Sequence, residues 1–147
     1  WDYPKVSDYD RPLKQRGIKD AHLLSKYLKK KLEVIYKLEP TVFEINKDDF
    51  IRLFNNLFSN AIKYNKMNGN ITITLKDKCL IIKDTGIGIK EEKIDDIFKR
   101  YYRATNLQGG FGIGLNIVWE ICKKYNIKLS VDSIYNKGTE IKVLFNL

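Results

Sequence analysis

Two carboxamides and an ammonium recur at helical spacing in residues 47–65, KDDFIRLFNNLFSNAIKYN. Asn56, Asn60 and Lys63 occupy positions i, i+4 and i+7, so they line up along one face of a helix. Neutral oxygen ligands beside a cation suit a polyphosphate that carries a metal ion. The alternative is an ordinary solvated helix face, and this stretch alone does not separate the two.

A carboxylate and two glycines follow an apolar run, in the sequence Asp84-Thr85-Gly86-Ile87-Gly88. A carboxylate at the end of a buried strand is partly desolvated, so it needs a strong donor such as an amine or amide of a ligand. Glycines let the backbone approach a flat ring closely. The same pattern is also typical of a simple turn that ends a strand.

A glycine-rich stretch, GGFGIG at residues 109–114, runs directly into an expected helix. Gly110, Gly112 and Gly114 leave successive amides unobstructed, and the helix N-terminus points at the same place, which makes an anion site. The glycine spacing differs from the dinucleotide fingerprint, and no G-K-S/T Walker sequence occurs. A flexible hinge is the alternative. Arg103, just ahead of the loop, is either a phosphate ligand or a surface arginine.

The helix that carries the two carboxamides also has an apolar face. Asp48 or Asp49 lies where an N-cap or a first-turn acid is expected. The apolar residues recur at i, i+3 and i+4 and form one stripe that faces a core: Phe50, Leu53, Phe54, Leu57, Phe58, Ala61 and Ile62.

The other elements mix strands and helices, without a helix between every pair of strands. Helices are expected at 18–31 and 115–125, with a short mixed-charge segment at 90–103. The pattern predicts an α+β fold, a two-layer sandwich with a mixed sheet of about five strands and three helices on one face. Residues 1–17 are expected to be a linker or lead-in, and 18–147 a single domain. Strands are expected at 32–39, 41–46, 70–76, 79–84, 127–132 and 139–145.

Length and composition are those of one globular domain, with 147 residues, 44% hydrophobic and 31% charged. The net charge of +9 raises nucleic-acid binding as an alternative, but the lysines are scattered through every expected element, which favours a lysine-rich surface. His22 is the single histidine, which excludes histidine-rich metal sites. Cys79 and Cys122 are expected to be buried free thiols.

Taken together and in this order, the motifs resemble the C-terminal ATP-binding catalytic domain of bacterial sensor histidine kinases. NLFSNAIKY is similar to the family's asparagine box, DTGIGI to its first glycine box, IFKRYYR to its phenylalanine box and GGFGIGL to its second glycine box. The ending from Ser133 to Thr139 also matches. The resemblance covers roughly residues 20–147 and implies the Bergerat-type ATP-binding fold, which topoisomerase subunits, mismatch-repair ATPases, heat-shock chaperones and anti-sigma serine kinases share.

The resemblance implies ATP and Mg²⁺ as cofactors and assigns roles to individual residues. Asn60 would be the Mg²⁺ ligand, with support from Asn56, while Lys63 and Arg103 would contact phosphates. On the base side, Tyr64 would flank the adenine and Asp84 would accept from its amino group, in a pocket shaped by Gly86, Gly88 and Thr139. On the phosphate side, under a lid of residues 104–109, would lie Gly110, Gly112, Gly114 and Leu115.

One departure within the wider superfamily concerns the general base. The other members of the superfamily named above typically carry a glutamate one turn before the metal-binding asparagine, where it activates water or a hydroxyl, and this chain has Asn56 there. An amide is not a useful base near neutral pH, so the site favours transfer to an external nucleophile. His22, in the sequence DAHLL, does not match the family's phosphoacceptor context. The acceptor histidine is therefore expected on a separate dimerisation domain.

The resemblance also implies partners and a location. No apolar run is long enough to span a bilayer, and the chain opens on Trp1, so we expect a piece of a longer protein. The piece is expected to be a monomeric cytoplasmic domain, and the whole protein a homodimer anchored in the inner membrane that phosphorylates a response regulator. No nucleic-acid partner is expected. The alternative function is a non-catalytic ATP-sensing or scaffold module of the same fold.

Overall fold

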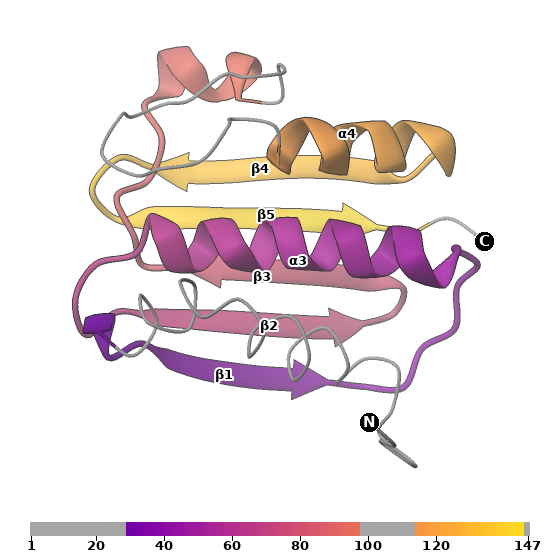
Figure 1. Cartoon of the computed structure of the whole chain (residues 1–147), viewed down its shortest axis with the longest axis horizontal. Coiled ribbons are helices and arrows are strands. Elements are labelled where there is room, and N and C mark those ends of the chain that lie inside the picture. The colour runs from indigo at the N-terminus through magenta and orange to yellow at the C-terminus, as the bar shows by residue number, and fades with distance from the viewer. Residues whose placement is uncertain (1–28, 98–113, 146–147) are drawn as a thin grey trace.

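The computed structural model describes residues 29–97 and 114–145 (Figure 1). Five strands and two helices make up most of this part of the chain, with a short 3₁₀ helix, η2 (Glu91–Asp96), after the third strand. The helices are α3 (Lys47–Lys63) and α4 (Gly114–Lys124). The strands are β1 (Glu33–Leu38), β2 (Asn70–Lys76), β3 (Cys79–Asp84), β4 (Lys128–Ile134) and β5 (Gly138–Leu144).

The strands form one mixed sheet in the order β1-β2-β3-β5-β4. β1 and β2 run parallel, with α3 as the crossover between them, and the other neighbouring pairs are antiparallel. Both helices lie on the same face of the sheet and run side by side (Figure 1). The α+β sandwich expected from the sequence is therefore confirmed.

The core lies between these two layers. The apolar stripe of α3 is confirmed: five of its seven residues are buried, and Phe50 and Phe58 pack at the margin. α4 adds Val118, Ile121 and Cys122. The sheet contributes the alternate side chains that point toward the helices, chiefly Ile71, Ile73, Leu75, Leu80, Ile82, Ile141 and Val143.

Residues 41–46, expected as a strand, do not form one. This segment connects the end of β1 in the sheet to the start of α3 in the helical layer. Phe43 stacks on Phe145 with ring centroids 4.0 Å apart, whereas Val42 is 82% exposed. The alternation of apolar and polar residues thus reflects alternate burial of a connection, without pairing to another strand.

The cap of α3 decides between the two roles that the sequence left open for Asp48 and Asp49. Asn46 is the N-cap, and its Oδ1 accepts from the backbone N–H groups of Asp48 at 2.9 Å and Asp49 at 3.3 Å. Both aspartates lie in the first turn, where negative charge is favourable beside the helix N-terminus. Asp48 and Asp49 are therefore first-turn acids, and neither is the N-cap.

β3, the apolar run that the sequence predicts as a buried strand, is buried on one face only. Leu80 and Ile82 are buried, whereas Cys79 and Ile81 on the other face are partly exposed. The helices cover only one face of the sheet among the described residues, so every strand has an outer face. Cys79 and Cys122 are free thiols as expected, but only Cys122 is buried.

The other expected elements appear with small shifts of their ends. Of the helix expected at 18–31, residues 29–31 are described: 29 and 30 are helical, and Lys31 is a turn residue. Residues 1–17 and His22 lie outside the described ranges. Within those ranges, no helix combines the length and the apolar character that a membrane crossing requires.

Candidate ligand-binding site at the ends of α3 and β3

The C-terminal end of α3, the end of β3 and the start of β5 lie at the same side of the sheet (Figure 1). Asp84 is the last residue of β3 and pairs across the ladder with Thr139 of β5. Gly86 and Gly88 follow directly. The structure therefore brings the first glycine box together with the end of the helix that carries Asn60 and Lys63.

The carboxylate of Asp84 is fixed through one of its two oxygens. Oδ1 accepts from the backbone N–H of Gly86 at 2.8 Å and of Thr139 at 3.3 Å. Among the described residues, Oδ2 has no hydrogen-bond partner and is left for another donor. Burial raises the pKa of Asp84 to about 6, although the two backbone hydrogen bonds favour the charged form.

The side chains of Ser133 and Thr139 form a hydrogen-bonded pair on the β4–β5 side of this carboxylate. Their hydroxyl oxygens lie 2.8 Å apart, and Ser133 Oγ also accepts from the backbone N–H of Ile89 at 2.8 Å. Ser133 Oγ donates to the carbonyl of Gly138 at 3.0 Å. Ser133 therefore joins the β4–β5 hairpin to the loop that contains Gly86 and Gly88. No role for this serine was predicted from the sequence, although Ser133 begins the final motif.

Gly86 and Gly88 lie in close contact with the backbone of neighbouring segments. A Cβ on Gly86 would lie 2.1 Å from the carbonyl oxygen of Tyr64, which accepts from Ile87 N at 2.9 Å. Gly88 has a φ of +67°, and a Cβ there would lie 2.2 Å from the carbonyl oxygen of Ile134. The chain therefore passes between the end of α3 and the β4–β5 turn without room for a side chain.

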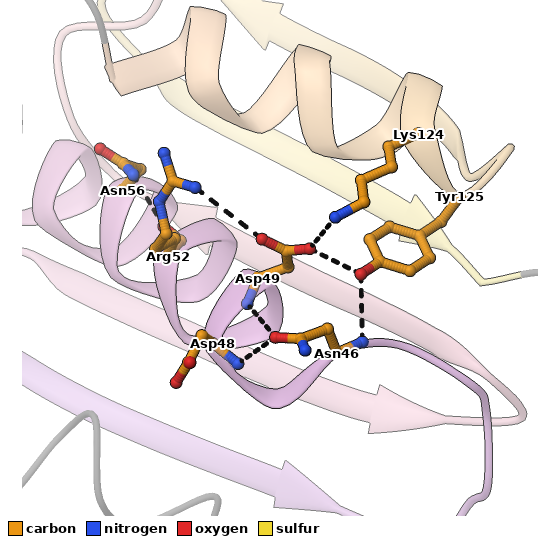
Figure 2. A network of polar contacts seen from close by, with 7 residues as sticks. All are labelled: Asn46, Asp48, Asp49, Arg52, Asn56, Lys124 and Tyr125. Atoms are coloured by element: carbon orange, nitrogen blue, oxygen red, sulfur yellow. Dashed lines mark hydrogen bonds and ion pairs between the residues drawn. The ribbon is translucent and has the colours of Figure 1, made fainter.

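The polar face of α3 is partly exposed and presents oxygen atoms. Asn56 donates its Nδ2 to the carbonyl of Arg52 at 2.7 Å, one turn earlier (Figure 2). Its Oδ1 is therefore the atom left for a ligand. The side chain of Asn60 makes no hydrogen bond to another described residue. Two neutral oxygens one turn apart are ligands that Mg²⁺ accepts.

Lys30 caps the C-terminal end of α3. Its Nζ donates to the carbonyl oxygens of Ile62 at 3.0 Å and Lys63 at 2.6 Å. An ammonium is favourable at a helix C-terminus, where carbonyl groups lack intrahelical partners. The last turn, which carries Lys63 and precedes Tyr64, is thereby ordered. Lys30 was not foreseen because its partners are more than thirty residues away along the chain.

A polar network holds α3 and α4 together at the end away from the site (Figure 2). Asp49, whose side chain is 13% exposed, accepts from Lys124 Nζ at 2.8 Å and from Tyr125 Oη at 2.6 Å. Arg52 is a longer-range partner at 3.8 Å. The hydrogen bonds from Lys124 and Tyr125 lower the pKa of Asp49, and the same contact raises the pKa of Lys124.

α4 begins at the site. Its first residue is Gly114, and Leu115 packs against the core as a partly buried side chain. α4 runs antiparallel to α3, so the network at Asp49 joins the two helices at the ends that are away from the site. Arg103, Gly110, Gly112 and the expected lid at 104–109 lie outside the described residues.

The chain is similar to known proteins in both sequence and fold. A family model described as "Histidine kinase-, DNA gyrase B-, and HSP90-like ATPase" matches residues 45–147. The chain is 36% identical over 114 residues to the sensor protein kinase WalK of Staphylococcus epidermidis, covering 70% of this chain and 19% of WalK. It is 36% identical over 121 residues to the sensor histidine kinase YvrG of Bacillus subtilis, covering 78% of this chain and 21% of YvrG.

The fold has close counterparts among solved structures. The mycobacterial sensor histidine kinase MprB aligns with a TM-score of 0.73 and 24% identity, covering 88% of this chain and 93% of that one. At this level of identity the likeness concerns the fold alone. The chain spans about a fifth of the length of the curated relatives it matches.

Proposed function

The chain belongs to the family of histidine kinase-, DNA gyrase B- and HSP90-like ATPases, and on that premise we propose that it is the ATP-binding catalytic domain of a sensor histidine kinase. In this proposal the domain holds Mg-ATP while the γ-phosphoryl group passes to a histidine on a separate dimerisation domain. The observation that carries the proposal is Asp84, a partly buried carboxylate with one oxygen bound to backbone and the other left for a ligand.

The base side of the proposed site is Asp84 with its neighbours. A desolvated carboxylate oxygen fixed at the end of a strand suits an exocyclic amino group, such as that of adenine. Thr139 and the backbone of Gly86 orient this carboxylate through its other oxygen. We assign Tyr64, whose carbonyl contacts the same loop, to the edge of the base pocket, together with Gly88.

The phosphate side is the polar face of α3. The donor set fits a magnesium polyphosphate: Asn60 would ligate Mg²⁺, Asn56 would support it through Oδ1, and Lys63 would contact phosphate. When bound, Mg-ATP supplies the phosphoryl group and the metal charge that neutralises it. Arg103, Gly110, Gly112, Gly114 and Leu115 are proposed to complete this side.

Transfer is proposed in preference to hydrolysis because of Asn56. Its carboxamide nitrogen donates to the carbonyl of Arg52. The side chain therefore offers no base to activate water near neutral pH. The residues of the site would act by positioning the phosphoryl group and by compensating its charge. The acceptor histidine, a response-regulator partner, homodimerisation and an inner-membrane anchor all belong to the proposed longer protein.

Calorimetry with Mg²⁺ and a non-hydrolysable ATP analogue tests the proposal. The chain should bind the analogue, and Asp84→Asn should weaken binding about 10- to 100-fold, as the loss of a charged hydrogen-bond acceptor does. Asp132→Asn makes the same chemical change on the exposed side of β4 and should leave binding unchanged. A chain that does not bind, or equal effects of the two variants, would contradict the proposal.

The kinase activity itself needs a second assay. The chain, supplied with Mg-ATP and a dimerisation domain that carries the phosphoacceptor histidine, should phosphorylate that domain. Asn60→Asp should slow this transfer, because a carboxylate changes the charge at the metal ligand. Nucleotide binding without any transfer would favour the alternative, a non-catalytic ATP-sensing or scaffold module.

A further inference from the structure

Asn65 is a buried polar side chain directly after the α3 C-cap. It is 6% exposed and is the one buried polar residue in the described ranges. Its Oδ1 lies 3.1 Å from the hydroxyl of Thr85, and its Nδ2 donates to the carbonyl of Asn70 at 3.0 Å. A buried carboxamide is retained at low cost only when both of its ends are paired, and here both are.

Thr85 hydrogen-bonds to both Asn65 and the backbone of Asn70. Its hydroxyl accepts from the backbone N–H of Asn70 at 2.9 Å, and its own N–H donates to the Asn70 carbonyl at 3.2 Å. Three segments therefore meet at this point: the end of α3, the start of β2 and the residue that follows Asp84. We call Asn65, Thr85 and the backbone of Asn70 the Asn65–Thr85 junction.

The junction is closely packed against the backbone of Gly69. A Cβ on Gly69 would lie 2.2 Å from Asn65 Oδ1 and 2.7 Å from Thr85 Oγ1. The chain before β2 therefore closes over the two polar side chains. Asn65 Oδ1 also accepts from the N–H of Lys66 at 2.9 Å, which fixes the orientation of its carboxamide.

The position of the junction gives it a consequence for the site. Asn65 is two residues after Lys63, and Thr85 is the residue after Asp84. The junction therefore connects the proposed phosphate side of the site to its proposed base side. The hydrogen bond from Ile87 N to the Tyr64 carbonyl is the neighbouring backbone link between the same two segments.

We propose that Asn65 and Thr85 are positioning residues that hold Asp84 in register with Lys63 and Asn60, and so set the affinity of the domain for nucleotide. Neither side chain is proposed to touch the ligand. A ligand that spans both sides of the site gains its full affinity only when the two sides are held at the right separation. This inference rests on the proposed function.

The hydroxyl of Thr85 is the group to change. Thr85→Val keeps the size of the side chain but removes the donor to Asn65 and the acceptor for Asn70, whereas Thr85→Ser keeps both. Tyr125→Phe is the control, because it removes a hydrogen-bonded hydroxyl between the other ends of α3 and α4. Thr85→Ala replaces the valine variant if that variant does not fold.

The measurements are the dissociation constant of a non-hydrolysable ATP analogue with Mg²⁺ and the thermal midpoint of each free variant. Thr85→Val should raise the dissociation constant about three- to tenfold, the change that corresponds to one net hydrogen bond. Thr85→Ser should restore it, and Tyr125→Phe should lower the thermal midpoint while leaving the constant within about twofold of the parent chain.

Two results would overturn the inference. One is a valine variant that binds no more weakly than Tyr125→Phe, and the other is a serine variant that binds as weakly as the valine variant. Either result leaves the proposed function standing, provided that the parent chain binds the analogue. A parent chain that does not bind the analogue overturns the proposed function, and this inference with it.

Discussion

The phenol of Tyr125 donates a hydrogen bond of 2.6 Å to the carboxylate of Asp49, which joins the residue after α4 to the first turn of α3. Tyr125 Oη also accepts from the backbone N–H of Asn46, the N-cap of α3, at 3.2 Å. One hydroxyl therefore ties the end of one helix to the cap of the other. The opposite ends of both helices lead toward the candidate site, so this contact holds the helix pair together at the end that is away from the site.

Removal of that hydroxyl should destabilise the domain. Tyr125→Phe leaves the Asn46 N–H and one Asp49 oxygen without this partner, which should lower the free energy of unfolding by about 1–2 kcal/mol. Urea denaturation at pH 7 measures the change. Tyr135→Phe, at a half-exposed ring whose hydroxyl has no hydrogen-bond partner among the described residues, should change stability little. Equal losses in the two variants would contradict the role given to Tyr125.

The stabilising contribution of Asp49 should depend on pH. Its pKa in the folded chain lies below the ordinary value of 3.8, because Lys124 and Tyr125 donate to its charged form. The contribution is therefore present above pH 3.8 and is lost as the pH falls through the lowered pKa. Asp49→Asn should be less stable than the parent chain at pH 7, and the difference should shrink in acid. Unfolding measured at several pH values would refute this if the difference stayed constant.

The contribution of Asp84 to stability should have the opposite dependence on pH. Burial raises its pKa from 3.8 to about 6, so between these values the folded chain binds more protons than the unfolded chain. Its contribution to stability is therefore present at low pH and is lost as the pH rises through about 6.

The Asp84→Asn variant tests this sign. The free energy of unfolding of the parent chain, relative to the variant, should fall by up to about 3 kcal/mol between pH 4 and pH 7 in the absence of nucleotide. Asp132→Asn provides the matched control on an exposed strand position. Parallel pH curves for the parent chain and Asp84→Asn would show that the carboxyl group is not desolvated as the structure indicates.

A side chain at Gly86 should damage both the fold and the site. The Cβ of Gly86→Ala would lie 2.1 Å from the Tyr64 carbonyl, which is backbone and must move. The cost should be about 1–3 kcal/mol of stability, as overpacking typically is. Nucleotide binding should also weaken, because Gly86 N orients Asp84. An alanine variant with unchanged unfolding and unchanged binding would contradict the close approach.

The sequence predicted the parts of the fold that local pattern determines. The apolar stripe of α3 and the alternation of Ile71, Ile73 and Leu75 each match the period of one element and the face that it buries. Residues 41–46 show the weakness of that method. Alternation there comes from Phe43 and Ile45 packing against the core margin, and periodicity does not reveal whether a partner strand exists.

The residues of the candidate site were predicted more completely than the contacts that fix them. Asp84, Gly86 and Thr139 were recognised through motif order, and the structure brings them within hydrogen-bonding distance. Lys30 was not recognised because its partners are more than thirty residues away, and Asn65 was not recognised because its side-chain contact with Thr85 spans 20 residues. Such tertiary hydrogen bonds leave no periodic trace, although Asn65 directly follows the asparagine box.

The order of strands in the sheet bears on how this domain can diversify. β3 pairs with β5, and β4 is added outside β5. The hydrogen-bond ladder on either side of Asp84 is therefore complete without the chain between Thr85 and Ile127. Lengthening a loop adds little to the free-energy cost of closing it, about 0.6 kcal/mol for each doubling of its length. Changes in chain length between Ile97 and Gly114 are therefore expected to leave the strands that hold Asp84 paired, so the proposed phosphate side of the site can vary in length while the proposed base side keeps its support.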